Sequence, residues 1–272
     1  MNFDWNTLLL GVVQGATEFL PVSSSGHLAL SRMFLGWDFY YSDSFLAFDL
    51  ILHCATVLVV LIAFRSDITT FLSQWISGFF SPEARTSEGW QYGWAILAAS
   101  AVTACIALPL KGYVELAMES RLAVGAGLLV TAGLLSIVPL FSENSKHSLL
   151  KVALVVGLIQ GFAVFPGVSR SGSTIATALF MGLAAPKAFR LSFLMSVPVI
   201  VGASLLEVTQ VLRAGITLPD GWLIAACAAF LVGYFALNLL RRLVLSGKWA
   251  YFGVYCFFLG MVAIVSDIAT RF

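Results

Sequence analysis

Six apolar runs, each about 20 residues long, constrain this chain more than any other feature of its sequence. A helix of that length crosses the hydrocarbon core of a bilayer, and lipid offers the backbone no hydrogen-bond partner outside a helix or a closed barrel. Composition agrees, because 60% of the residues are hydrophobic and only 11% are charged. The runs cover residues 45–64, 90–110, 122–140, 187–212, 221–240 and 249–268. We therefore predict an all-α, polytopic membrane protein that forms one membrane domain over residues 1–272.

Two further apolar regions, residues 5–36 and 149–183, are interrupted. Pro21 with three serines breaks the first, and Pro166-Gly167 with serines, a threonine and an arginine breaks the second. Each half is too short to span a bilayer, which favours re-entrant helical hairpins. Irregular backbone at membrane depth is tolerated only inside protein or beside a wet cavity. We expect both breaks to line such a cavity.

The two breaks are copies of one motif. Residues 11–27 read GVVQGATEFLPVSSSGH and residues 157–173 read GLIQGFAVFPGVSRSGS, and they align without a gap. Three predicted spans separate them, so the second copy should be upside down relative to the first. We predict an inverted repeat with halves of about 1–140 and 141–272, whose breaks meet near the midplane. The alternative is a duplication that is kept only because glycine and serine allow close helix packing.

The second break has the chemistry of an anion site. Its polar side chains stand at the start of a helix, where unpaired backbone N–H groups and partial positive charge favour anions. The guanidinium of Arg170 matches the geometry of phosphate oxygens and is costly inside a membrane without a function. The alternative is a structural ion pair between Arg170 and Glu18. The expected phosphate ligands here are Ser169, Arg170, Ser171, Ser173 and Thr174.

The first break differs at the residues that carry chemistry. Gln14 and Glu18 are four residues apart, so they share a helix face. Glu18 can act as a base or hold a divalent cation together with substrate phosphates, with Gln14 as a second ligand. Ser23, Ser24 and Ser25 add hydroxyls near the phosphates, and His27 adds a group that transfers protons. A second i, i+4 pair, Asp49 and His53, is expected to orient the site or to be only a structural pair.

Lys and Arg counts indicate the orientation. If the first hairpin enters from outside, nine of these residues flank the cytoplasmic side and five the other side. The N-terminal MNFDWNTLLL has no Lys or Arg, so we expect it to be retained rather than cleaved as a secretory signal. No basic cluster is interleaved with aromatic residues, which argues against a nucleic-acid partner.

The paired motifs GVVQGATEFLPVSSSGH and FPGVSRSGST, together with LILHCAT, resemble the signature regions of the bacterial undecaprenyl pyrophosphate phosphatases, the BacA/UppP family. The family's first signature has Glu or Gln, three residues, then Glu, and this chain has Gln14 and Glu18. Ser24 and His27 match the family's Ser and His. The second signature maps onto Pro166, Gly167, Ser169, Arg170, Ser171 and Thr174.

The resemblance implies that the chain removes the terminal phosphate of undecaprenyl pyrophosphate, using Mg²⁺ or Ca²⁺, for carrier-lipid recycling in peptidoglycan synthesis and for bacitracin resistance. It implies a multi-pass protein of the bacterial plasma (inner) membrane, with its active site facing the periplasm. Glu18, Ser24, His27 and Arg170 are the expected catalytic residues, with Ser24, His27 or water as the nucleophile. Membrane lipids are expected partners, and a homodimer is one open arrangement. The main alternative is a transporter or flippase for an anionic lipid.

Overall fold

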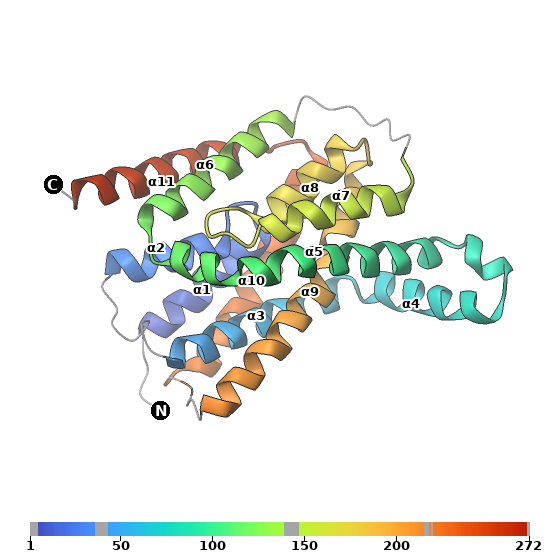
Figure 1. Cartoon of the computed structure of the whole chain (residues 1–272), viewed down its shortest axis with the longest axis horizontal. Helices are drawn as coiled ribbons and strands as arrows, with labels where there is room; N and C mark the ends of the chain where they lie inside the picture. The colour runs from blue at the N-terminus through green and yellow to red at the C-terminus, as the bar shows by residue number, and fades with distance from the viewer. Residues whose placement is uncertain (1–4, 36–42, 139–146, 215–217, 219, 271–272) are drawn as a thin grey trace.

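The computed structural model describes residues 5–35, 43–138, 147–214, 218 and 220–270, and within these ranges it contains helices and no strand (Figure 1). The helices are α1 (Trp5–Phe19), α2 (Ser24–Leu35), α3 (Asp43–Ala63), α4 (Arg65–Phe80), α5 (Glu88–Met118), α6 (Arg121–Ile137), α7 (Leu149–Phe162), α8 (Arg170–Phe180), α9 (Ala185–Ala214), α10 (Trp222–Leu245) and α11 (Ala250–Ala269). A short 3₁₀ helix, η2 (Glu83–Thr86), joins α4 to α5. The all-α prediction is confirmed.

Four helices, α5, α9, α10 and α11, are each long and apolar enough to cross a membrane. Helix α3 passes the same test only together with α4, from which it is bent by 75°. Helix α6 has 17 residues, at the lower limit for a span. A multi-pass membrane protein is confirmed. The predicted runs leave residues 65–89 outside any helix, but in the structure α4 occupies Arg65–Phe80 and α5 already begins at Glu88.

Several helices begin where a serine accepts a hydrogen bond from a backbone N–H three residues ahead. Ser87, Ser120 and Ser148 cap α5, α6 and α7 in this way, with distances of 3.3, 3.2 and 3.4 Å. Such caps satisfy donors that have no partner inside the helix. Serine hydroxyls therefore stabilise the starts of these three helices, whereas α4, α10 and α11 begin without a side-chain cap.

The helices pack in pairs. Figure 1 shows α6 beside α11 along one edge and α4 beside the first half of α5. Helix α1 packs against α10, and α7 packs against α5. Glycines allow both contacts: a Cβ on Gly11 would lie 2.2 Å from the Ala225 oxygen, and one on Gly157 would lie 2.6 Å from the Ala99 oxygen. Gly11 and Gly157 are aligned positions in the two motif copies, so the copies make matching contacts.

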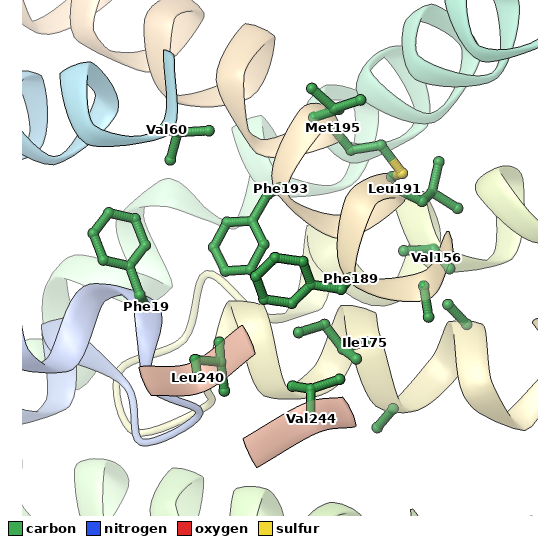
Figure 2. Packing of buried hydrophobic residues seen from close by; sticks show 14 of the residues in the cluster. Phe19, Val60, Val156, Ile175, Phe189, Leu191, Phe193, Met195, Leu240 and Val244 are labelled. Carbon is green, nitrogen blue, oxygen red and sulfur yellow. The ribbon is translucent and has the colours of Figure 1, made fainter. Parts of the chain in front are cut away.

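The main core lies where α1, α7, α8, α9 and α10 converge with α3 and α4. Figure 2 shows Phe19 facing Phe193 and Phe189, with Ile175, Leu240 and Val244 beneath the rings. Phe19 directly follows Glu18, so this core holds the end of α1 and supports the candidate site.

Candidate active site

The two serine-rich breaks lie directly against each other. A Cβ on Gly26 would stand 2.8 Å from the nitrogen of Gly167, and one on Gly172 would stand 3.0 Å from the Cβ of Pro21. Gly26 aligns with Gly172 and Pro21 with Gly167, so these are the same contact made from both sides. Only glycine leaves room for so close an approach. The breaks are therefore in contact, as the sequence predicted.

Ser23 and Ser169, which are also aligned, organise the two breaks. Ser169 Oγ accepts a hydrogen bond from Gly172 N at 3.1 Å and caps α8, and Ser23 Oγ accepts one from Gly26 N at 3.3 Å at the start of α2. Ser23 Oγ also accepts from Gly167 N at 3.0 Å, which ties one break to the other. Ser23 has φ +70°, a backbone conformation that non-glycine residues seldom adopt. A strained residue held by such contacts is a mark of a functional site.

Glu18 is the centre of the polar cluster. Its side chain is 5% exposed, and Arg170 Nη2 lies 2.5 Å from its Oε1. Its Oε2 accepts hydrogen bonds from Ser24 Oγ at 2.7 Å and from Gln14 Nε2 at 3.0 Å. The structure therefore joins a carboxylate and a hydroxyl from the first break to a guanidinium from the second. The ion pair named as the alternative for Arg170 is present, and Arg170 also lines the cavity described next.

A cavity of about 300 Å³ opens between the breaks. Ser23, Ser24, Ser25, Ser169 and Arg170 line it, and so does Glu18. Helices α2 and α8 both begin at its wall, so their N-termini supply the partial positive charge that suits an anion. The cavity is thus a polar pocket suited to a phosphate group and placed inside an apolar bundle.

His27 does not face this cavity. Its Nε2 lies 2.7 Å from the Tyr255 hydroxyl, and its ring stacks on that of Tyr255 with centroids 5.6 Å apart. Its Nδ1 lies 2.7 Å from the Ser23 carbonyl oxygen. The imidazole therefore packs toward α11, and the geometry gives no support to the expected catalytic role of His27.

His53 is the imidazole that does line the cavity. Its Nε2 is 3.9 Å from Glu18 Oε2, and its Nδ1 is 3.4 Å from an Asp49 carboxylate oxygen. The expected Asp49–His53 pair is present, and His53 links it to Glu18, whose carboxylate it helps to hold in place. The sequence predicted that Asp49 and His53 could orient the site, but it did not place His53 beside Glu18, because His53 belongs to neither break.

Three expected phosphate ligands point elsewhere. Ser171 and Thr174 are buried, and their hydroxyls donate to backbone oxygens of Leu20 at 3.4 Å and Arg170 at 2.8 Å. Ser173 is buried with no hydrogen-bond partner for its hydroxyl, and it borders a separate apolar cavity. None of the three lines the polar cavity, so their predicted role stays a prediction without geometric support.

The sequence reasoning also left out polar groups that the fold brings to the cavity. Thr103 of α5 lies 3.1 Å from Gln160 Nε2, and both line the cavity wall. Ser196 and Glu207 reach it from α9. Gln160 is the aligned partner of Gln14, which was the one signal available in the sequence; Ser196 and Glu207 stand in a long apolar run with no motif.

The side chains do not form a ready metal site. Within the described residues, no group of three or more His, Cys, Asp and Glu side chains is arranged to hold a metal ion. Both Glu18 oxygens already accept hydrogen bonds, and Gln14 is fully buried behind Glu18 and does not line the cavity. The expected Gln14–Glu18 ligand pair therefore does not fit a resident cation in this arrangement.

Comparison with known proteins places this geometry in a family. The undecaprenyl-diphosphatase of Desulfosudis oleivorans is 39% identical over 94% of this chain and 96% of its own length. The proteins of the same name from Treponema denticola and Korarchaeum cryptofilum are 38% and 37% identical, and each alignment covers 94% or more of both chains. The family described as bacitracin resistance protein BacA matches residues 7–262. With its two packed serine-rich breaks and this match over nearly its whole length, the chain belongs to the BacA family.

Proposed function

We propose that this chain is an undecaprenyl pyrophosphate phosphatase, which hydrolyses undecaprenyl pyrophosphate to undecaprenyl phosphate and inorganic phosphate. The observation that carries the proposal is the meeting of Glu18, Ser24 and Arg170 in one cavity between the breaks. A carrier or a purely structural protein has no need for a hydroxyl hydrogen-bonded to a carboxylate beside a phosphate-sized anion pocket. The relatives that share the chain's length carry the name of this activity.

Arg170 and the two helix N-termini supply the positive charge for the pyrophosphate. Arg170 pairs with Glu18 through one end of its planar guanidinium. A phosphate that enters the cavity competes with Glu18 for this fork. As the guanidinium turns to the phosphate oxygens, it stabilises the charge that spreads over the transferring group.

Ser24 is the proposed nucleophile and Glu18 its proton acceptor, because their oxygens are 2.7 Å apart. Ser24 Oγ attacks the terminal phosphorus while its proton passes to Glu18 Oε2. The bond from phosphorus to the bridging oxygen breaks, and undecaprenyl phosphate leaves with that oxygen. Glu18 gives that proton to the departing phosphate oxygen and becomes a carboxylate again. Water then attacks the phosphoserine while Glu18 accepts its proton, the bond from phosphorus to Ser24 Oγ breaks, and Glu18 returns the proton to Ser24 as inorganic phosphate leaves.

In this scheme Glu18 takes the proton-transfer role that the sequence assigns to His27, and His53 positions Glu18. Its contacts with Glu18 and Asp49 hold the carboxylate that accepts the Ser24 proton. No step is assigned to His27, whose ring contacts Tyr255. Asp49 acts through His53 and is a positioning residue.

The need for Mg²⁺ or Ca²⁺ stays a prediction that rests on the family resemblance. Because the described donors do not form a resident site, the scheme above routes no step through a cation. We propose that a cation, where one is required, arrives coordinated to the pyrophosphate, as Mg²⁺ commonly does with substrate phosphates.

We further propose that the halves 1–140 and 141–272 form an inverted repeat in the bacterial inner membrane, with the cavity facing the periplasm. The matched packing of Gly11 and Gly157 and the matched caps of Ser23 and Ser169 support the repeat. The Lys and Arg count supports the orientation. A homodimer remains an arrangement to be tested by light scattering of the purified protein.

The test is phosphate release by the purified full chain in detergent micelles that contain undecaprenyl pyrophosphate. Ser24→Ala is expected to abolish turnover. The parent enzyme, treated with substrate labelled on the terminal phosphate and quenched in sodium dodecyl sulfate at neutral pH, which preserves both phosphoserine and phosphohistidine, should carry label on Ser24. Label on a histidine would overturn the Ser24 assignment. Turnover without any phosphoenzyme would support direct attack by water.

A transporter or flippase remains the second candidate, and the packed broken helices are the feature that favours it. Detergent micelles have no compartments, so phosphate release there requires an enzyme. Substrate movement in sealed vesicles without phosphate release would favour the carrier.

A further inference from the structure

A second polar cavity shares two helices, α3 and α9, with the catalytic cavity but lies at other residues along them. It has a volume of about 290 Å³ and is bordered by the start of α4, the first turns of α9 and the second half of α10. On α9 the catalytic cavity involves residues 196–207 and the second cavity residues 186–190. Its charged lining is Arg65, Arg190, Arg241 and Asp67, and we call it the arginine cavity.

Phenylalanine rings separate the two cavities. Phe19 follows Glu18 at the catalytic site and lies 5.9 Å, between ring centroids, from Phe193 (Figure 2). Phe193 in turn is 4.7 Å from Phe189 and 5.9 Å from Phe64, which both line the arginine cavity. The arginine cavity is therefore a site of its own and not an extension of the catalytic pocket.

The charges of the arginine cavity are only partly balanced. Arg190 is held in place, with Nε 3.3 Å from Asp67 Oδ1, Nη1 3.6 Å from a Glu88 oxygen and its guanidinium over the Phe71 ring. No described carboxylate lies within 4.0 Å of Arg65 or Arg241. Two arginines thus line one small cavity without an acidic partner, and Arg65 Nη1 donates a hydrogen bond to the Ile62 carbonyl oxygen at 3.4 Å.

The rim of the arginine cavity is apolar and exposed. Ile62, Tyr234 and Leu245 line it and are 42%, 42% and 53% exposed on the outside of an apolar bundle. Guanidinium groups beside such a rim match a molecule with an anionic head and apolar chains. A free anion would gain nothing from these side chains.

We propose that the arginine cavity binds the phosphate headgroup of an anionic membrane phospholipid, with Arg65 and Arg241 as the phosphate ligands and the acyl chains against the rim. Guanidinium forks match phosphate oxygens and form strong, charge-assisted hydrogen bonds. The site is separate from the phosphatase activity and does not depend on it.

The experiment is native mass spectrometry of the full-length protein, released from neutral detergent, with phosphatidylglycerol added in steps. Arg65→Ala and Arg241→Ala are each compared with Arg242→Ala, which removes the same charge one residue away from a side chain that is exposed and does not line the cavity. Each cavity variant is expected to weaken the tightest phosphatidylglycerol binding by roughly tenfold, the loss of one charge-assisted hydrogen bond. Arg242→Ala should change it less than about twofold.

Two further arms identify the ligand. Phosphatidylcholine, which has the same phosphate but no net charge, should bind equally weakly to the parent and to all three variants. Equal phosphatidylglycerol binding by the Arg241→Ala and Arg242→Ala proteins would overturn the site. Displacement of the lipid by an equal concentration of inorganic phosphate would overturn its assignment to a lipid headgroup. Unchanged thermal unfolding by circular dichroism, without lipid, shows that each variant is folded.

Discussion

Replacing Arg170 by Lys tests whether the shape of the guanidinium, rather than its charge, drives the reaction. Arg170 approaches Glu18 at 2.5 Å, and the two side chains are 19% and 5% exposed. Lysine keeps the charge but offers a point donor in place of a planar fork. The variant should still neutralise Glu18 and fold, whereas Arg170→Ala would leave a buried carboxylate unpaired at a cost of about 3–5 kcal/mol.

The expected loss follows from the hydrogen bonds that Lys cannot make to the transferring phosphate. One charge-assisted hydrogen bond contributes about 1.5–3 kcal/mol. At about 1.4 kcal/mol per factor of ten, kcat/KM should fall about 10- to 150-fold. Because the interaction strengthens in the transition state, most of the loss should appear in kcat.

The assay is phosphate release from undecaprenyl pyrophosphate in detergent micelles, measured from low to saturating substrate. Arg242→Lys is the matched control, since Arg242 is exposed at the far end of α10. If Arg170→Lys keeps kcat within about threefold of the parent while the protein stays folded, the guanidinium is not the group that stabilises the transferring phosphate.

Three shorter predictions follow from other parts of the structure. Gly11→Ala should lower the melting temperature and reduce the free energy of unfolding by about 1–3 kcal/mol, because the added methyl would lie 2.2 Å from a backbone oxygen of α10. Gly112→Ala is the control and should leave the melting temperature unchanged, because no atom lies within 4 Å of its added methyl. His53→Ala should lower kcat about tenfold, because it removes one contact worth about 1.4 kcal/mol, and His27→Ala should lower kcat less. If the phosphate-release assay shows the larger loss for His27→Ala, the proton-transfer role returns to His27. Glu18→Gln should lower kcat about 100-fold without changing the Mg²⁺ concentration that gives half-maximal activity, and a clear shift in that concentration would identify Glu18 as a metal ligand.

The long helices and the two breaks were predictable because each follows from a strong local signal. A run of about 20 apolar residues has one stable form in lipid, and Pro with several serines cannot continue it. Helix α4 was missed because RSDITTFLSQWISGFF mixes polar and apolar residues and falls short of a spanning run. Its helical form depends on tertiary packing against α5, and part of that contact is a fit of Trp90 against Gly78.

The catalytic role of His27 stays a prediction without geometric support, because the sequence could not show which residues surround the ring. His27 follows Ser24 by three residues, and this spacing suggests a common face but does not say what stands on either side of it. Tyr255, 228 residues later, takes the His27 ring onto the side of α2 away from the cavity. His53 gives no local signal beyond Asp49 and becomes important only because α3 passes Glu18.

The polar site depends on the sequence differences between the two breaks. Aligned positions with different side chains line the same cavity: Glu18 corresponds to Val164, and Ser24 corresponds to Arg170. An exact copy would set two carboxylates or two guanidinium groups close together in a pocket inside the protein, where like charges repel strongly. The divergence instead pairs the Glu18 carboxylate with the Arg170 guanidinium, while the aligned serines Ser23 and Ser169 keep their role as helix caps. A Val164→Glu substitution reverses that step by adding a second carboxylate to the cavity, and we expect it to lower the melting temperature, measured by circular dichroism in detergent; an unchanged melting temperature would contradict this account of the divergence.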